Sequence, residues 1–206
     1  MAATDWLAQG TLVLASNNKG KIAEFETLFA QLDLPVQVIP QGQLNIEDAV
    51  EDGLSFVENA ILKARHAAKI SGKPAIADDS GLCVDALNGR PGVYSARYSG
   101  EDGNSERNID KVLGELADIH EDDKRSAKFV SVVSIAYPNG KIKSYRGEVE
   151  GRILNERDGK NGFGYDSIFY STDLKKSFGQ ATPDEKKQVS HRARAFAQLR
   201  KEELEK

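Results

Sequence analysis

Short apolar runs and helical stripes alternate along the first eighty residues. The apolar run at 11–15 is followed by Ser16-Asn17-Asn18, which is typical of a buried strand that ends in a turn. A helix is predicted over 21–32, because its apolar residues keep a helical spacing. A second strand is predicted over 36–39. A third covers 75–77, and Asp78-Asp79-Ser80-Gly81 reads as its polar end.

Between the second and third strands, Ser55 and Glu58 form a capping-box pattern that begins a helix. The predicted buried stripe of this helix consists of Val57, Ala60, Ile61, Ala64 and Ala68. Asn59, Lys63, His66 and Ile70 fall on a stripe roughly opposite these alanines.

The second half of the chain predicts one more helix, a hairpin and a closing helix. The helix covers 105–116, and strands over 128–137 and 141–149 flank the turn Pro138-Asn139-Gly140. A glycine-rich loop from residue 155 passes into a short strand at 167–170. Thr182-Pro183-Asp184-Glu185 begins a helix that is broken near Ser190 and continues to the end. The order of elements predicts a mixed α/β fold.

Composition narrows the protein class. With 206 residues, 39% hydrophobic and 29% charged, the chain suits a globular protein, and no apolar run approaches the roughly 20 residues of a membrane span. The first ten residues carry no basic cluster, so a signal peptide is not expected. The single cysteine, Cys83, rules out an internal disulfide, and three widely spaced histidines disfavour a zinc site. This composition favours a cytoplasmic location. A net charge of −4 disfavours nucleic acid as a partner, but a small polyanion could still bind where cations converge.

Two segments could bind phosphate and metal. Residues 16–21 join a strand to a helix start, where backbone N–H groups and a lysine favour an anion; a polar turn that binds nothing is the alternative. At 78–79, two consecutive strand side chains point to opposite sides, so at most one carboxylate faces a given site. That carboxylate could hold Mg²⁺, or the pair could form an Asx-turn. Glu47, Asp48, Glu51 and Asp52 form either a solvated face or the source of a second metal ligand.

Other candidates have equally plain alternatives. Lys63 could reach a phosphate or remain an exposed helical lysine. The aromatic side chains of Gly162-Phe163-Gly164-Tyr165-Asp166 could stack on a base or pack into the core under the loop. Ser190-His191-Arg192, with Lys186 about one turn earlier, offers hydrogen-bond donors, although a basic helix start is common.

Six ordered segments together resemble the inosine/xanthosine triphosphate pyrophosphatase family. The similarity runs from about Thr11 to Leu199. It departs from the family at Ser16-Asn17, where many members have Thr-Gly, and at Val50, where some carry a second acid before Glu51. The matching segments are Ser16-Asn17-Asn18 with Lys21, Phe56–Ala60 with Lys63-Ala64, Ala77–Gly81, Pro91–Arg97, Phe163–Asp166 and Ser190–Arg192.

The resemblance implies a fold and a reaction. The fold is a mixed, elongated central sheet flanked by helices in two lobes, with the active site in the cleft between them. Residues 1–206 form one domain, of which 1–10 are an extra or disordered N-terminal segment, and the protein is a homodimer. The implied reaction converts ITP, dITP or XTP and water into the monophosphate and pyrophosphate, with Mg²⁺.

The resemblance also assigns roles to residues. Asp79 is a general base or metal carboxylate, Glu51 is a second metal ligand, and Lys21 and Lys63 act with them. Phe163 stacks on the purine, and Asp166, His191 and Arg192 read its edge. The triphosphate is held by Ser16, Asn18, Lys21, Lys63 and Lys186 with Ser80 nearby; Asn17, Lys19, Gly20, Gly164 and Tyr165 complete the substrate-binding set.

The physical logic agrees with these assignments, because cations must neutralise a polyanionic substrate and an arginine donor suits a 6-oxo acceptor better than a 6-amino donor. Two alternatives remain. A Maf-type nucleotide pyrophosphatase would act on other nucleotides, and a non-catalytic nucleotide sensor would bind without turnover.

Overall fold

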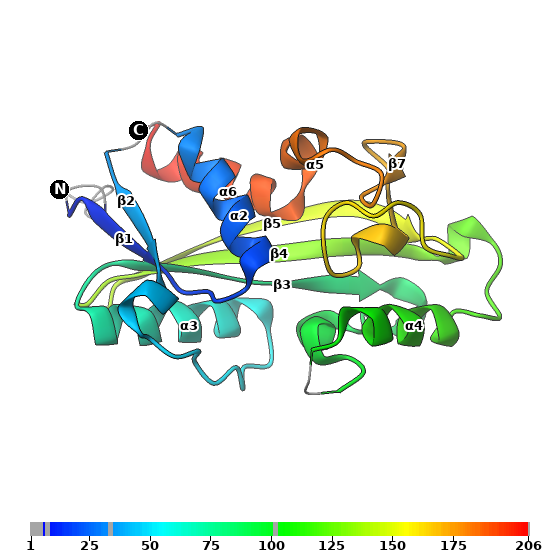
Figure 1. Cartoon of the computed structure of the whole chain (residues 1–206), viewed down its shortest axis with the longest axis horizontal. Coiled ribbons are helices and arrows are strands. Elements are labelled where there is room, and N and C mark those ends of the chain that lie inside the picture. Colours follow the sequence, from blue (N-terminus) through cyan, green and yellow to red (C-terminus); the bar gives the residue numbers. More distant parts are fainter. Residues whose placement is uncertain (1–5, 7–8, 33–34, 101–102, 206) are drawn as a thin grey trace. The chain divides into compact units, whose positions relative to one another are not determined.

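The computed structural model describes residues 6, 9–32, 35–100 and 103–205. Within them, seven strands form one sheet in the order β2-β1-β3-β4-β5-β6-β7 (Figure 1). Strand β1 is parallel to β2 and β3, whereas β6 is antiparallel to β5 and β7, so the predicted mixed α/β class is confirmed. The strands are β1 (Thr11–Leu14), β2 (Gln37–Pro40), β3 (Ala75–Val84), β4 (Ser126–Ala136), β5 (Ile142–Ile153), β6 (Phe169–Ser171) and β7 (Lys176–Ser177).

Side chains that cap the first turn explain where four helices begin. Asn18, Ser55, Asn104 and Thr182 each accept the backbone N–H three residues later, which would otherwise lack a partner. The α-helices of the described residues are α2 (Lys19–Ala30), α3 (Phe56–Ser71), α4 (Ser105–Glu115), α5 (Pro183–Val189) and α6 (His191–Glu203). Short 3₁₀ helices are η1 (Gln41–Leu44), η2 (Asp85–Leu87), η3 (Gly92–Arg97), η4 (Asp122–Lys124) and η5 (Asp166–Ile168). The predicted break at Ser190 is confirmed.

The chain divides into two compact units. Unit 1 comprises Met1–Asp79, Ser131–Gly147 and Arg192–Lys206, and unit 2 comprises Ser80–Val130 and Glu148–His191. Each has its own apolar core: in unit 2, for example, Phe129, Phe169 and Phe178 pack with ring centroids 4.6 to 6.1 Å apart. The predicted active-site cleft between two lobes and the single-domain assignment stay predictions.

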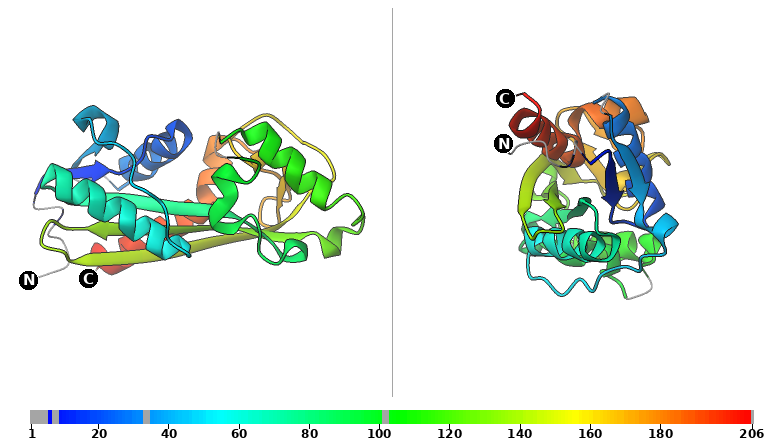
Figure 2. Two further views of the ribbon diagram at one scale, coloured as in Figure 1. Left: turned by 90° about the horizontal axis from the view of Figure 1, so that it is seen from below. Right: turned by 90° about the vertical axis from the view of Figure 1, so that its left-hand side faces the viewer.

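Strand side chains in unit 1 alternate between two cores. Helices α2 and α6 lie on one face of the strands and α3 lies on the other (Figures 1 and 2). Leu12, Leu14 and Ile76 pack with α2 and α6, whereas Val13, Ala75 and Ala77 pack with the alanines of α3. Because successive strand residues face opposite sides, this register assigns Asp78 to the α2/α6 face and Asp79 to the α3 face.

The prediction that β3 ends in the polar residues Asp78-Asp79-Ser80-Gly81 is wrong. The strand continues to Val84, so both aspartates lie inside it and neither forms an Asx-turn. Leu82 and Val84 are fully buried and continue the strand as apolar residues. The polar residues before them are tolerated within the strand because the buried aspartates have charged partners.

The buried stripe of α3 also differs from the prediction. Val57 is 39% exposed, whereas Asn59 is completely buried beside Phe56 and Ala60. The periodicity misled here because Asn59 has a polar partner in the preceding loop, which allows a polar side chain to face inward.

The described part of the N-terminal segment includes Trp6, which is completely buried and packs edge-to-face on Phe29. Residues 1–5 and 7–8, to which most of the prediction about the N-terminal segment refers, lie outside the described residues. No helix among the described residues is long and apolar enough to cross a membrane.

Candidate active site

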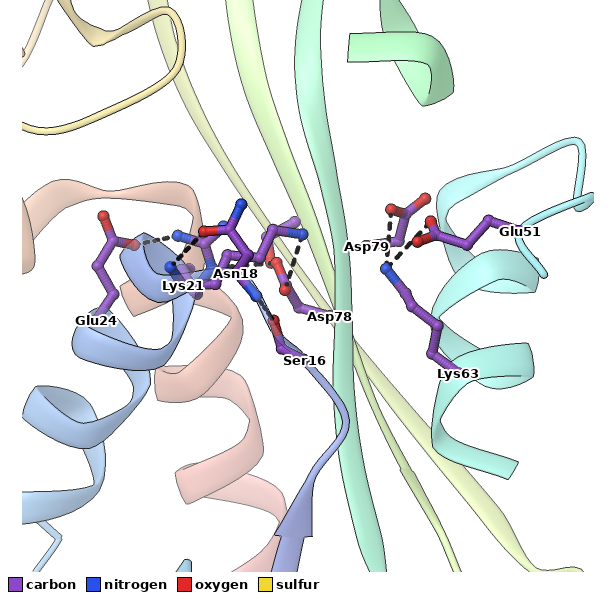
Figure 3. Close-up of polar contacts among 10 residues, drawn as sticks. Ser16, Asn18, Lys21, Glu24, Glu51, Lys63, Asp78 and Asp79 are labelled. Carbon is purple, nitrogen blue, oxygen red and sulfur yellow. Dashed lines mark hydrogen bonds and ion pairs between the residues drawn. The ribbon is translucent and has the colours of Figure 1, made fainter. Parts of the chain in front are cut away.

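Asp78 and Asp79 project to opposite sides of β3 and belong to two different polar clusters (Figure 3). Lys21 approaches Asp78 from α2, whereas Lys63 approaches Asp79 from α3. The prediction that the two carboxylates point apart is confirmed. The alternation that separates the two apolar cores thus also separates the two carboxylates.

On the α3 side, Lys63 lies between two carboxylates. Its Nζ is 3.3 Å from Asp79 Oδ1 and 3.2 Å from Glu51 Oε2. Burial alone would lower the pKa of Lys63, but the charges of Asp79 and Glu51 outweigh it and raise this pKa. Lys63 is therefore a protonated lysine held by two ion pairs, and not the freely exposed side chain of the alternative interpretation.

The buried carboxylate of Asp79 can accept further hydrogen bonds or a metal ion. Its Oδ2 atom has no hydrogen-bond partner among the described residues. Burial raises the pKa of Asp79, with Lys63 and Lys21 opposing the shift. A carboxylate oxygen in this state fits either a general base or a ligand for a hard cation.

On the other side of β3, Asp78 holds two cations. Its Oδ1 is 3.1 Å from Lys21 Nζ, and its Oδ2 accepts from Arg192 Nε at 3.1 Å and from the Ser131 hydroxyl at 3.4 Å. Burial would raise the pKa of Asp78, but Arg192 and Lys21 hold it well below its usual range. Arg192 also contacts Glu24, and these anions raise its pKa despite burial.

These contacts give Asp78 a structural role toward Lys21, whose pKa is lowered by burial. The edge-reading role that the resemblance gives Arg192 stays a prediction, since in this structure the guanidinium is occupied by Asp78 and Glu24. Glu24 was not among the predicted site residues. Its spacing of three from Lys21 on α2 is the only signal that could have indicated it.

The predicted phosphate turn is built by its own side chains. The Asn18 carboxamide accepts from Lys21 N at 3.0 Å, and the Ser16 hydroxyl accepts from Asn18 N at 3.2 Å. Asn17 donates to Asp48 Oδ1 at 2.9 Å. Lys19 is exposed and Gly20 is half-buried at the start of α2. The turn thus presents the N-terminal end of α2 next to Lys21, as an anion site requires.

The structure distinguishes the acids of residues 46–54, which we call the acidic loop. Glu51 contacts Lys63, whereas Asp48 accepts hydrogen bonds from Asn17 and, at 2.6 Å, from Gln41. The Glu47 carbonyl is 3.0 Å from His66 Nε2. Of the four acids, Glu51 is therefore the one that joins Asp79 at a common lysine.

Asp79 and Glu51 fit a Mg²⁺ site of low protein ligand number. The described residues contain no group of three or more histidine, cysteine or carboxylate side chains that could hold a metal. Mg²⁺ is commonly bound by one or two carboxylates, with waters and substrate phosphates completing its shell. The unpartnered Asp79 Oδ2 provides a ligand atom of the right kind.

Unit 2 contains a second cluster around Asp166. This buried carboxylate accepts from Lys186 Nζ at 2.7 Å and from Phe163 N at 2.9 Å, both at Oδ2. The Lys186 ammonium also lies 4.8 Å from the centroid of the Phe163 ring. Gly162 has φ +75°, and a Cβ there would lie 2.0 Å from Asp166 Oδ2, so the loop requires glycine at this position. Asp166 thus fixes the backbone at Phe163 and the ammonium group of Lys186 by accepting a hydrogen bond from each.

The other predicted site residues of unit 2 are placed as follows. Tyr165 is buried and donates its hydroxyl to the Ser95 carbonyl at 2.7 Å, so for Tyr165 the core alternative holds. The buried His191 ring stacks on Phe129 with centroids 4.9 Å apart. Gly164 has φ +57°, and Ser80 lies half-buried in β3.

Carboxylates and lysines at a phosphate turn, on a mixed α/β sheet, are features of a phosphate-binding protein of the α/β class. The sequence model of the Ham1 family matches residues 12–202. The chain belongs to the Ham1 family, which confirms the predicted relationship.

Relatives match over nearly the whole chain. The chain is 55% identical to a dITP/XTP pyrophosphatase of Acinetobacter baylyi, covering 97% of each. It is 50% identical to that of Haemophilus influenzae, covering 92% of this chain and 96% of the relative. Among solved structures, a HAM1 protein from Coxiella burnetii superposes with a TM-score of 0.82 at 45% identity, covering 92% and 95%. The Staphylococcus aureus Ham1 protein gives 0.81 at 44% identity, covering 93% and 96%.

Proposed function

We propose that the protein hydrolyses the non-canonical purine nucleotides dITP, ITP and XTP to the monophosphate and pyrophosphate. The observation that carries the proposal is the buried Asp79 carboxylate, which shares Lys63 with Glu51 and keeps one oxygen without a partner among the described residues. The names of full-length relatives at about 50% identity support the substrate class. Membership of the Ham1 family disfavours the Maf-type alternative.

Charge neutralisation by the protein's lysines is the first requirement of the reaction. Lys21 and the N-terminus of α2 would hold the phosphates on one side of β3, and Lys63 on the other. Lys21 is well suited to this, because burial lowers its pKa and a phosphate would supply the negative charge that favours its protonated form.

Asp79 would orient a water molecule and accept its proton. The water oxygen bonds to the α-phosphorus, the bond from that phosphorus to the bridging oxygen breaks, and pyrophosphate leaves. The Asp79 Oδ2 atom, which has no hydrogen-bond partner among the described residues, is the atom that would accept the proton. A Mg²⁺ ion held by Asp79 and Glu51 would supply further neutralisation of phosphate charge.

Phe163, the residue proposed to stack on the purine base, belongs to the unit 2 cluster. Phe163 offers a ring for stacking, and the Lys186 ammonium is held beside it by Asp166. An ammonium group donates a hydrogen bond to the 6-oxo oxygen of hypoxanthine or xanthine, whereas the 6-amino group of adenine is itself a donor and is opposed. We therefore propose that Lys186 reads the base and does not bind the triphosphate. It does so in addition to Arg192, which was predicted to read the base.

The test is a product assay with ITP, dITP, XTP, GTP, ATP and dTTP. We expect pyrophosphate as the direct product from the first three, activity that requires a divalent metal, and loss of activity in EDTA. Orthophosphate as the direct product would contradict the mechanism. Binding of ITP without turnover would instead identify a nucleotide sensor, and preference for dTTP would support the Maf-type alternative.

Base reading is tested separately with Lys186→Ala, Arg192→Ala and, as a control, Lys21→Ala. Loss of a base-reading donor should lower kcat/KM for ITP by roughly 10–100-fold and reduce the ITP/ATP ratio. Lys21→Ala should lower kcat/KM for ITP and for ATP about equally, because phosphate contacts carry no information about the base. An unchanged ratio in both test variants would show that the base is read elsewhere.

The homodimer, implied by the family resemblance, and the cytoplasmic location, favoured by the single cysteine, also belong to this proposal. Light scattering with size-exclusion chromatography measures the molar mass in solution. A monomeric mass would contradict the homodimer.

A further inference from the structure

In the acidic loop, the one buried apolar side chain is that of Ile46 (4% exposed), five residues before Glu51. Residues 46–53 form neither helix nor strand, and Val50 and Leu54 are 78% and 84% exposed. Apolar contacts of these side chains therefore do not set the position of Glu51 within the loop. Closer to Glu51, polar contacts hold the loop on either side of it: Asp48 is bound by Gln41 and Asn17, and Gly53 is bound by Asn59.

The Asn59 contact is the buried one. The Asn59 carboxamide oxygen accepts from Gly53 N at 2.8 Å, two residues after Glu51, and the asparagine is completely buried. Only the oxygen can accept from a backbone N–H, so this contact fixes the orientation of the amide. A Cβ at Gly53 would lie 2.6 Å from Asn59 Oδ1, so the close approach also requires glycine in the loop.

Asn59 is otherwise poorly suited to its place in the core. Its Nδ2 atom is buried without a hydrogen-bond partner among the described residues, which costs folding free energy. An apolar side chain would avoid that cost but could not bind Gly53. Asn59 also lies four residues before Lys63 on α3, so one helix face binds the loop backbone at Gly53 and the carboxylate at Glu51.

We propose that Asn59 is a positioning residue, which holds Gly53 so that the Glu51 carboxylate remains at Lys63, where Asp79 also binds. The inference rests on the proposed function, in which Glu51 and Asp79 hold a divalent metal. Asn59 acts only through the loop and has no direct part in the chemistry.

The test compares Mn²⁺ binding to the wild-type protein and to Asn59→Ala, measured without nucleotide by the electron paramagnetic resonance signal of free Mn²⁺. We expect binding about tenfold weaker or more, the usual effect of removing a residue that orients a metal ligand. Asn108→Ala is the matched control. Asn108 is a buried asparagine on α4 whose Oδ1 accepts from Ser99 N at 2.7 Å in unit 2. Its carboxamide makes four hydrogen bonds, so this substitution should destabilise the fold at least as much as Asn59→Ala and leave Mn²⁺ binding unchanged.

A double-mutant cycle separates positioning from general destabilisation. In a Glu51→Gln background, Asn59→Ala should weaken Mn²⁺ binding no further, because its effect passes through the Glu51 carboxylate. Additive losses, or unchanged binding in Asn59→Ala, would overturn the inference. If Asn59→Ala fails to fold, Gly53→Ala disturbs the same contact from the loop side and should reproduce the loss.

Hydrolysis of ITP by the wild-type protein keeps the two proposals distinguishable. Turnover by the wild type with unaltered Mn²⁺ binding in both variants refutes only the positioning role. A wild-type protein that binds Mn²⁺ but lacks turnover refutes the proposed function and leaves the cycle valid. Absence of Mn²⁺ binding to the wild type overturns the metal site and the positioning role with it.

Discussion

Neighbouring substitutions at Asp78 and Asp79 should separate stability from catalysis. Asp78 and Arg192 each have side chains 1% exposed and lie 3.1 Å apart, and Lys21 depends on the same carboxylate. Removing one partner of a buried ion pair costs about 3–5 kcal/mol. For a chain of this size, about 2–4 °C per kcal/mol makes Asp78→Asn lower Tm by roughly 6–20 °C.

Asp79→Asn should behave in the opposite way. Burial raises the pKa of Asp79, so its ionised form is unfavourable in the folded protein, and a neutral amide removes that cost while Lys63 keeps Glu51. The substitution also removes the ion pair between Lys63 and Asp79. Because this loss and the relief of the burial cost offset each other, we expect a free energy of unfolding within about 1 kcal/mol of the wild type, measured without metal. Turnover should nonetheless fall on the order of 10²-fold or more if Asp79 is the base.

The pH dependence provides a check of the Asp78 argument. A carboxylate whose pKa is depressed in the folded state contributes stability that is present above its unfolded pKa of about 3.9 and is lost as pH falls through the lower folded pKa. Asparagine does not titrate. The stability difference between the wild type and Asp78→Asn should therefore be equal at pH 8 and pH 5 and shrink only below about pH 4.

The assays are urea unfolding followed by fluorescence and kcat with ITP and Mg²⁺ well below each Tm. Trp6 is the only tryptophan and lies in the core of unit 1, so its emission reports on the unit that holds both aspartates. Equal effects of the two substitutions on turnover at unchanged stability would refute the assignment. So would an Asp78→Asn protein as stable as the wild type.

Two further predictions concern the loop of unit 2 and the N-terminal segment. Gly162→Ala places a Cβ 2.0 Å from Asp166 Oδ2 at φ +75°, so it should cost about 1–3 kcal/mol and raise KM for ITP by displacing Phe163. Gly164→Ala, where nothing lies within 4 Å of the added Cβ, should cost less; equal effects would contradict the role given to Asp166. Trp6→Ala should lose about 3–5 kcal/mol, measured by circular dichroism, because the indole is fully buried against Phe29. A melting temperature within 2–3 °C of the wild type, about 1 kcal/mol, would show that this contact contributes little.

The sequence by itself determined the local features of the protein. Helix starts at Ser55 and Thr182, the break at Ser190 and the hairpin at 138–140 follow from capping and turn chemistry that acts within a few residues. The opposite directions of Asp78 and Asp79 follow from the two-residue period of a strand. The order of six short motifs was enough to identify the family.

The tertiary structure decided which partner each of these side chains meets. Asp78 binds Arg192, 114 residues away, and Asn59 faces inward because Gly53 offers its N–H from an irregular loop. The same holds for β3, which continues through two aspartates because lysines from two different helices meet them. Such pairings depend on which elements the fold brings together, whereas periodicity reports only the face on which a residue lies. A charged or amide side chain is buried where a distant partner compensates its desolvation, and no local pattern contains that partner.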